Sequence, residues 1–241
     1  MREFTGYIDI HTHILPGVDD GSKSMDETMK MIKIALEQGI KTIIATPHYV
    51  VGRENTPVEE LQAIKDTVEA EARKLDENMR IYLGNEIFYS DSVIEKLNSK
   101  KALTIANSNY VLVEFSYNEL YSVMYRGLDR LVRSGYIPIL AHVERYLDLY
   151  KNERHISEMM ELGCYMQMNC NSLIGGRFNS RVTYNKQLFK NGMIHFLGSD
   201  CHDSKVRIPN IEKAVDALLK KCKEEMVYQI VYENPLILLQ E

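Results

Sequence analysis

Short apolar runs alternate along the chain with longer segments in which apolar residues recur every three or four positions. This alternation is typical of βα units arranged around a parallel sheet. Seven runs have the length and composition of strands, and they cover residues 7–10, 42–45, 80–83, 111–115, 137–141, 165–169 and 194–197. Seven parallel strands suit a closed or nearly closed barrel, so we expect an α/β fold with a distorted (β/α)7 barrel.

The first predicted helix has clear boundaries. Ser24 and Glu27 form a capping box at its start, and Gly39 ends it. Its apolar face consists of Met25, Met29, Ile32 and Leu36. Thr56 and Pro57 are expected to begin a second helix in the same way. We find no internal repeat beyond the βα alternation, and we expect one domain over residues 1–241.

Composition and charge narrow the class of protein. The content of 45% hydrophobic and 26% charged residues is ordinary for a soluble globular protein. No apolar run reaches the roughly 18 to 20 residues of a membrane span. Residues 1–4 are expected to lead directly into the first strand and not to form a signal peptide. We therefore expect a cytoplasmic protein. The four cysteines form no C-x-x-C pair, which favours reduced thiols. The net charge of −5 argues against a general nucleic-acid surface.

Side chains that can bind metal follow the predicted strands at the point where each strand ends. In a parallel barrel these ends open onto one face, where the catalytic sites of such folds lie. Six strand ends supply nine candidate ligands, which are His11, His13, an aspartate of the following turn (Asp19 or Asp20), His48, Glu86, Glu114, His142, Asp200 and His202. Nitrogen and oxygen ligands without thiolate fit Mn, Fe, Zn or Mg. The sequence therefore predicts a metal site at this face.

Residue spacing supports the metal prediction. His11 and His13 have one residue between them, and so have Asp200 and His202. Both side chains of such a pair leave an extended backbone on the same side and can reach one ion. Glu114 ends an otherwise apolar strand, where a buried charge without a cation would be costly.

Three further residues have other expected roles. His155 lies in a helical stretch and His195 lies inside the last predicted strand, so we expect both to be structural. Asp9 is expected to hold His11 or a neighbouring ligand in one tautomer and not to bind metal itself.

Taken together, these residues resemble the polymerase-and-histidinol-phosphatase (PHP) superfamily of metal-dependent phosphoesterases over essentially the whole chain. Its signatures occur in order as His-x-His at 11–13, Thr-Pro-His at 46–48, the later strand histidine at 142 and Asp-x-His at 200–202. The resemblance implies a TIM-barrel-like PHP fold. Residues 8–21 with their Asp-Asp-Gly turn, 113–116 and 141–146 are more similar to the manganese-dependent protein-tyrosine phosphatases of Gram-positive capsule and exopolysaccharide clusters.

The resemblance implies three metal sites, with manganese as the expected ion. The implied ligands are His11, His13, Glu86 and Asp200 for one ion, the bridging Glu86 with Glu114 and His142 for a second, and Asp20, His48 and His202 for a third. The third set depends most on the family, and Asp19 stays an alternative to Asp20.

The family's two phosphate-binding arginines match Arg145 and Arg207, whose guanidinium groups suit a pair of phosphate oxygens. One segment departs from the family. Close relatives can carry basic residues immediately after the histidine of the second motif, whereas residues 49–52 here precede the first basic residue, Arg53. Substrate contacts in that loop therefore do not carry over from the family.

These features predict a phosphoric monoester hydrolase that acts as a metal-dependent protein-tyrosine phosphatase. Two divalent ions about 3.5 to 4 Å apart can lower the pKa of a shared water and aim the resulting hydroxide at phosphorus, so no cysteine nucleophile is needed. The resemblance implies that the substrate is phosphotyrosine on a membrane-associated bacterial tyrosine kinase that regulates capsule and exopolysaccharide synthesis.

Three alternatives stay open. A histidinol-phosphate phosphatase or another small-molecule PHP phosphoesterase would differ at the Asp-Asp-Gly turn, near which many histidinol phosphatases carry a histidine. A PHP-like binding module would have lost ligands, and no candidate position here is lost. A cysteine-dependent phosphatase is suggested by the Cys-x5-Arg spacing of Cys201 and Arg207, but the residues between them include no glycine that would let backbone N–H groups converge on phosphate.

Overall fold

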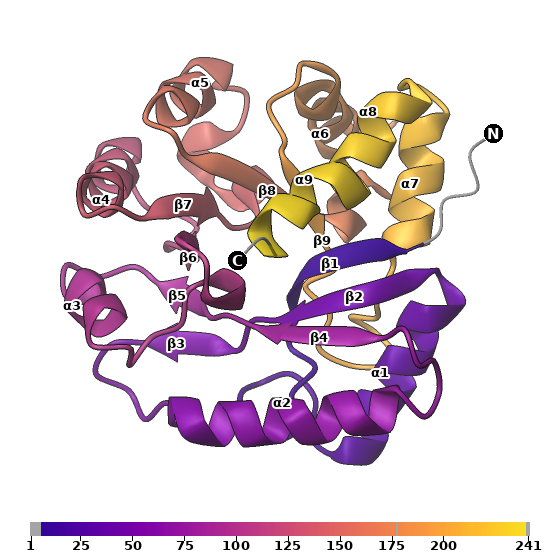
Figure 1. The fold of residues 1–241 in the computed structure, drawn as a ribbon. Coiled ribbons are helices and arrows are strands. Elements are labelled where there is room, and N and C mark those ends of the chain that lie inside the picture. The colour runs from indigo at the N-terminus through magenta and orange to yellow at the C-terminus, as the bar shows by residue number, and fades with distance from the viewer. Residues whose placement is uncertain (1–5, 177, 240–241) are drawn as a thin grey trace.

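The structure is a computed structural model that describes residues 6–176 and 178–239. The predicted lead into the first strand, residues 1–4, lies outside this range. Helices lie on the outside of the strands (Figure 1), as expected for βα units. None of the helices in the described ranges has the length and hydropathy needed to cross a membrane.

Strands and helices alternate through most of the chain. The strands are β1 (Tyr7–Thr12), β2 (Ile40–Ala45), β3 (His48–Val50), β4 (Arg80–Leu83), β5 (Glu86–Phe88), β6 (Tyr110–Glu114), β7 (Ile137–Leu140), β8 (Tyr165–Asn169) and β9 (Phe196–Gly198). The helices are α1 (Met25–Glu37), α2 (Val58–Ala72), α3 (Val93–Asn98), α4 (Tyr121–Arg133), α5 (Glu153–Glu161), α6 (Ser180–Lys190), α7 (Ile211–Leu219), α8 (Glu224–Tyr228) and α9 (Asn234–Leu236). All seven predicted strands are present, and β3 and β5 were not predicted.

The strands are parallel and belong to two sheets, with the orders β1-β2-β4 and β3-β5-β6-β7-β8-β9. β2 and β4 each stop for two residues, and the chain then continues as β3 and β5 of the other sheet. Pro47 lies in the first break and has no N–H for a strand ladder. Asn85 lies in the second break, where its side chain donates to the Pro47 carbonyl at 2.9 Å and accepts from Leu103 N at 2.8 Å. The two breaks are therefore tied together.

The far edge of the second sheet lies beside β1. Thr12 forms an isolated parallel bridge with Cys201, and the Asp200 N–H donates to the His11 carbonyl at 2.8 Å. Gly198 permits this approach, because a Cβ there would lie 2.6 Å from the Cβ of His11. Over the described residues the strands form two sheets and not one continuous ladder, so the structure shows a mixed α/β fold with parallel strands.

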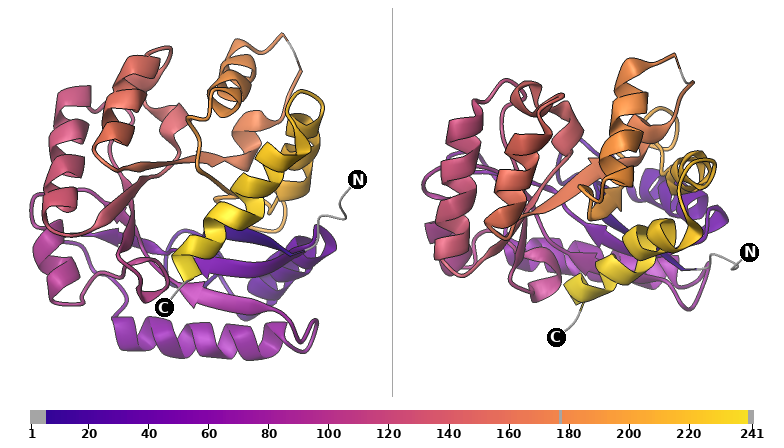
Figure 2. Two further views of the ribbon diagram at one scale, coloured as in Figure 1. Left: turned by 45° about the horizontal axis from the view of Figure 1, so that its top comes forward. Right: turned by 90° about the horizontal axis from the view of Figure 1, so that it is seen from above.

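The core has one large cluster and one smaller cluster of buried apolar residues. The smaller cluster includes Ile8, Ile44, Leu112 and Ile139, and Leu238 completes it from the C-terminal segment. Residues 229–233 and α9 of that segment pack across β1, while α8 packs against α7 (Figures 1 and 2). The segment lies at the amino ends of the strands, which leaves their carboxyl ends for a site.

The predicted helix boundaries are partly right. The Ser24 hydroxyl accepts from Glu27 N at 3.3 Å and Gly39 follows α1 with a φ of 82°, as expected. The Glu27 carboxylate does not complete the capping box, because it accepts instead from Ser204 N at 2.7 Å. The cap predicted for α2 is also wrong, since Pro57 occupies the N-cap position and no side chain caps this helix.

Candidate metal centre

The nine candidate ligands lie together at the carboxyl ends of the strands. β1, β3, β5 and β6 carry His11, His48, Glu86 and Glu114, and the segments after β1, β7 and β9 carry His13, Asp20, His142, Asp200 and His202. Ligand atoms of eight of the nine, all except His142, form three groups in which every atom lies within 4.8 Å of the others. The groups are His11, His13, Glu86 and Asp200; His48, Glu86 and Glu114; and His13, Asp20, His48 and His202.

Comparison with the expected ligand sets shows one match and two differences. The first group is the set expected for the first ion. In the second group His48 stands where His142 was expected, although His142 Nε2 lies 2.9 Å from Glu86 Oε1 and 3.4 Å from Glu114 Oε2. The third group contains the expected residues and also His13, which is shared with the first. Glu86, His13 and His48 therefore each belong to two groups and connect them.

Glu86 is the central carboxylate of the site. Its Oε2 lies 3.2 Å from His11 Nε2, 3.2 Å from His13 Nε2 and 3.1 Å from His48 Nδ1, while Oε1 faces His142. Burial alone raises the pKa of this carboxyl, but the surrounding histidines outweigh burial and hold its pKa well below the usual value. Glu86 is therefore an anion that can bridge neighbouring cations.

Asp200 joins the ligand groups to the two predicted arginines. Arg145 Nη2 lies 2.9 Å from Asp200 Oδ2, and Arg207 Nη2 lies 2.7 Å from Asp200 Oδ1. Burial raises the pKa of Asp200, whereas His11, His13 and Arg207 lower it to a net value of about 2. Both guanidinium groups thus stand at the edge of the ligand cluster, and each is about one-third exposed.

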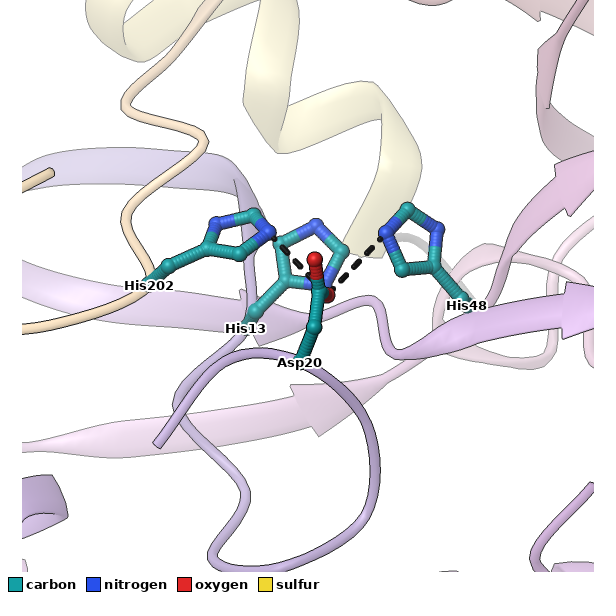
Figure 3. A group of neighbouring side chains, drawn as sticks. All are labelled: His13, Asp20, His48 and His202. Atoms are coloured by element: carbon teal, nitrogen blue, oxygen red, sulfur yellow. Dashed lines mark ion pairs between the residues drawn. The ribbon is translucent and has the colours of Figure 1, made fainter. Parts of the chain in front are cut away.

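The Asp-Asp-Gly turn uses its two aspartates differently. The Asp19 carboxylate lies 2.7 Å from His13 Nδ1 and accepts from the backbone N–H groups of His48 at 3.1 Å and Gly21 at 2.9 Å. Asp20 is 66% exposed, and its Oδ1 lies 3.4 Å from His48 Nε2 and 3.3 Å from His202 Nε2 (Figure 3). Asp19 therefore orients His13, and Asp20 offers its oxygens to the third group.

Two buried amides support the ligands and were not predicted. Gln167 Oε1 accepts from His142 N at 2.8 Å and lies 3.2 Å from His11 Nδ1. Gln167 donates to Asn169 at 2.9 Å, and Asn169 donates to Asp200 at 2.7 Å. The signal was present in the sequence, because polar residues at alternate positions of a buried strand lie on one face.

Asp9 does not have the predicted role. Its Oδ1 accepts from the backbone N–H groups of Ser199 at 2.9 Å and His11 at 3.4 Å. It therefore connects the backbones of β1 and the segment after β9, and it does not set the tautomer of a histidine ring. Gln167 is the residue that contacts the ring of His11.

His155 and His195 lie outside the ligand groups, as expected. The His155 ring stacks on Tyr121 with 3.7 Å between ring centroids. His195 precedes β9, in contrast to its predicted place inside the strand, and its Nδ1 accepts from Met166 N at 3.0 Å. Both rings therefore have structural contacts of their own.

The cysteine-dependent alternative is inconsistent with the surroundings of Cys201. The side chain is buried, and burial together with the nearby Asp9 carboxylate raises the pKa of the thiol. A reactive cysteine needs the opposite shift, because the thiolate is the nucleophile. In addition, the guanidinium group of Arg207 forms its ion pair with Asp200, as that of Arg145 does. The Cys-x5-Arg spacing is therefore coincidental.

The residues at this site fit divalent cations. Glu86 and Asp200 are 2% and 4% exposed, and such buried carboxylates are costly without cations. His142 Nδ1 is buried and has no hydrogen-bond partner among the described residues, while its Nε2 points to Glu86. Imidazole and carboxylate donors together are typical of sites for Mn, Fe, Zn or Mg.

Comparisons with known proteins identify the family of this chain. Residues 7–240 match the family model described as capsular polysaccharide synthesis, CpsB/CapC. The chain is 31% identical to the tyrosine-protein phosphatase CpsB of Streptococcus pneumoniae over 95% of this chain and 96% of that protein. It is 30% identical to the tyrosine-protein phosphatase YwqE of Bacillus subtilis over 97% of this chain and 91% of that protein.

Solved structures extend the comparison. One matching structure comes from a study of YwqE from B. subtilis and CpsB from S. pneumoniae, which that study describes as metal-dependent tyrosine phosphatases. It matches with a TM-score of 0.88 and 31% identity, and the match covers 96% of this chain and 94% of that chain. The phosphotriesterase homology protein of Escherichia coli matches with a TM-score of 0.61 and 14% identity over 98% and 99% of the two chains, a likeness of fold alone. The chain belongs to the capsular polysaccharide synthesis CpsB/CapC family.

Proposed function

We propose that this protein is a metal-dependent protein-tyrosine phosphatase that acts on phosphotyrosine of a tyrosine kinase controlling capsule or exopolysaccharide synthesis. The observation that carries the proposal is the convergence of nine side chains that could bind metal and two arginines on one face of the fold. The names of the full-length relatives support the tyrosine phosphatase activity and the link to capsule synthesis. They do not favour a histidinol-phosphate phosphatase.

The proposal includes the finer structural predictions. Manganese is the proposed ion, and the chain is proposed to be one PHP-type domain over residues 1–241. The Thr12–Cys201 bridge between the two sheets supports a distorted (β/α)7 barrel that is closed at the carboxyl ends of the strands. The nine predicted ligands are the proposed metal-binding residues, with Glu86, His13 and His48 each shared between two groups.

The chemistry divides between the ions and the chain. Bound divalent ions would supply Lewis-acid activation of water and stabilise negative charge on the phosphoryl group. Arg145 and Arg207 would bind phosphoryl oxygens, because guanidinium groups donate paired hydrogen bonds and Asp200 holds both at the edge of the ligand cluster. A phenolate is a better leaving group than an alkoxide, so an aryl phosphate needs less help from a protein acid.

An apolar surface next to the ligands supports an aryl substrate. Val50 pairs with Phe88 in the sheet, and each lies two residues beyond a candidate ligand, His48 and Glu86 respectively. Side chains two residues apart share one face of a sheet, so Val50 and Phe88 lie on the ligand side. They line a cavity of about 510 Å³ together with Glu114. We propose that the ring of phosphotyrosine packs on Val50 and Phe88.

The decisive experiment compares two substrates under two metal conditions. We expect the purified protein to hydrolyse a phosphotyrosine peptide when Mn is added and to lose this activity in EDTA. It should prefer the peptide over histidinol phosphate. Cys201→Ser should retain most activity, because the buried thiol has no role in the chemistry. His142→Ala should lose activity by about a hundredfold or more.

The control for His142→Ala is His155→Ala, which removes a histidine outside the ligand groups and should leave the peptide activity intact. Two results would overturn the proposal. Activity that resists EDTA and disappears in Cys201→Ser would replace the mechanism. A preference for histidinol phosphate over the peptide would replace the substrate.

A further inference from the structure

A second cavity adjoins the cavity beside the metal centre. The first has a volume of about 510 Å³ and the second, near the end of α3, about 500 Å³. Arg53, Asn55 and Thr56 line both cavities, so the two form one groove. The groove runs from the metal centre, past these three residues, to Lys100 and Lys101.

The middle of the groove is held by hydrogen bonds. Asn55 accepts from Val50 N at 2.9 Å and donates to the carbonyls of Val50 at 2.9 Å and Arg53 at 2.8 Å. The segment between these residues is thereby closed into a turn. This turn places Arg53 on the border between the two cavities.

The outer cavity has an excess of positive charge. Arg53, Lys100 and Lys101 line it, and all three are exposed. Glu59 is the single carboxylate among the lining residues of this cavity, and Glu95 of α3 lies close enough to Lys101 for that lysine to lower its pKa. Three cations and one carboxylate leave a local excess of two positive charges on a chain whose net charge is −5. An anionic ligand is complementary to this surface.

Lys100 occupies a position that glycine normally takes. The Lys101 N–H donates to the Lys96 carbonyl at 2.8 Å and the Lys100 N–H to the Leu97 carbonyl at 3.0 Å, which is the Schellman pattern at the end of α3. Lys100 has a φ of 56°, in the left-handed region where a side chain is unfavourable. A lysine at this position strains the backbone and places a charge in the groove.

We infer that Arg53, Lys100 and Lys101, here called the basic end of the groove, bind acidic side chains that lie near the phosphotyrosine in the substrate peptide. The inference rests on the proposed function, with the phosphoryl group at the metal centre and the ring on Val50 and Phe88. An extended peptide advances about 3.3 Å per residue, so carboxylates a few positions from the phosphotyrosine can follow the groove to its basic end.

The test uses three peptides of equal length, each with one phosphotyrosine. One has three Glu before the phosphotyrosine, one has three Glu after it, and one has Gln at all of these positions. For the unaltered protein we expect kcat/KM to be roughly three- to tenfold higher for one of the acidic peptides than for the Gln peptide, in line with one or two exposed charge pairs. This preference should shrink as salt is added.

Variants separate the basic end from the rest of the surface. The double variant Lys100→Gln with Lys101→Gln should lose the preference, while the matched double variant Lys220→Gln with Lys221→Gln, near the end of α7, should keep it. Lys100→Gly should lower the preference and leave the folded state as stable as before or more stable, because it removes the backbone strain. A purely structural role of Lys100 would not produce this combination.

Free phosphotyrosine distinguishes failure of the inference from failure of the proposed function. All variants should hydrolyse it at the rate of the unaltered protein, since the basic end lies outside the metal centre. If free phosphotyrosine is hydrolysed but no acidic peptide is preferred, or if the Lys100 and Lys101 double variant keeps the preference, the basic end has no role in substrate binding. If neither free phosphotyrosine nor any peptide is hydrolysed, both the proposed function and the inference are wrong.

Discussion

At the scale of single residues, the candidate ligands depend on partners that do not bind metal. Gln167 contacts the ring of His11 and the backbone of His142, and through Asn169 it reaches Asp200. One buried amide therefore positions candidate ligands that come from three different strand ends. Such outer partners fix the orientation of ligand side chains and raise metal affinity.

The first prediction concerns this amide. Gln167→Leu keeps the approximate shape of the side chain and removes its hydrogen bonds, so metal affinity should fall by about 10- to 100-fold. Competition with a fluorescent chelator measures this affinity. The control is Gln62→Leu on the exposed side of α2, which should bind metal as the unaltered protein does. Equal affinities for all three proteins would show that Gln167 does not position the ligands.

The second prediction concerns protons on two ligands. Burial lowers the pKa of His13, but hydrogen bonds to Asp19 and Glu86 raise it to about 10 overall. Burial likewise lowers the pKa of His142, while Glu114 and Glu86 raise it to about 9. Both rings are therefore protonated at pH 7 in the metal-free protein, and ions can bind only after both protons leave.

Metal binding at pH 7 should consequently release about two protons, and affinity should rise with pH until both rings are neutral near pH 9 to 10. Calorimetric titration with Mn in buffers of different ionisation enthalpy measures the protons released. His155→Ala should release the same number, because this ring lies outside the ligand groups. Binding that releases no protons and does not depend on pH would contradict the predicted protonation.

Single residues also show where sequence reasoning succeeds and where it stops. That the nine candidate side chains lie close together could be predicted, because each follows a strand end or repeats an i, i+2 spacing. Asp20 and Asp19 could not be told apart by spacing, since the choice depends on which carboxylate the backbone N–H groups of Gly21 and His48 hold. The role of Asp9 was mispredicted for a similar reason, because its partners are backbone groups distant in sequence.

At the scale of elements, the seven strands were predictable from their apolar runs, whereas β3 and β5 were not. Each of these strands has three residues and follows a longer strand after two residues. Such a run has too few positions for a period-2 pattern to appear. The break after β2 could have been anticipated from Pro47, but the change of sheet depends on hydrogen bonds of Asn85 to distant residues.

The third prediction concerns the contact between β1 and β9. A Cβ at Gly198 would lie 2.6 Å from the Cβ of His11 and 3.0 Å from Gln167 Nε2. Gly198→Ala should therefore push these elements apart, lower the free energy of unfolding by about 1 to 3 kcal/mol and weaken metal binding through displacement of His11. Urea unfolding and chelator competition measure the two effects.

Gly176→Ala is the matched control, because nothing lies within 4 Å of a Cβ at that position and its backbone is not left-handed. It should change the free energy of unfolding by no more than about 0.5 kcal/mol. If Gly198→Ala is as stable as this control and binds metal as tightly, the packing of β1 against β9 does not determine the position of His11.

At the scale of the whole molecule, buried carboxylates lie towards one end of the strands. The smaller apolar cluster, which includes Leu238, lies towards the other end. Glu86, Asp200 and Asp9 are each less than 5% exposed. Histidines and arginines offset part of this negative charge, and bound cations would offset more. Since the ligands come from both sheets, ions would also connect β1, β5 and the segment after β9.

The fourth prediction follows from this arrangement. Ions that bind the folded state and not the unfolded chain stabilise the protein by about 2.7 kcal/mol at a concentration of 100 times Kd. For a chain of this size, that corresponds to a rise in Tm of roughly 5 to 10 °C. Removal of metal with EDTA followed by dialysis should lower Tm by this amount, and added Mn should restore it.

Glu86→Gln should lose most of the difference in Tm between the metal-free and the Mn-loaded protein, because Glu86 contacts candidate ligands of all three groups. Glu60→Gln, at an exposed position of α2, should keep it. If the metal-free and the Mn-loaded protein melt at the same temperature, the ion-binding residues do not contribute to the stability of the fold.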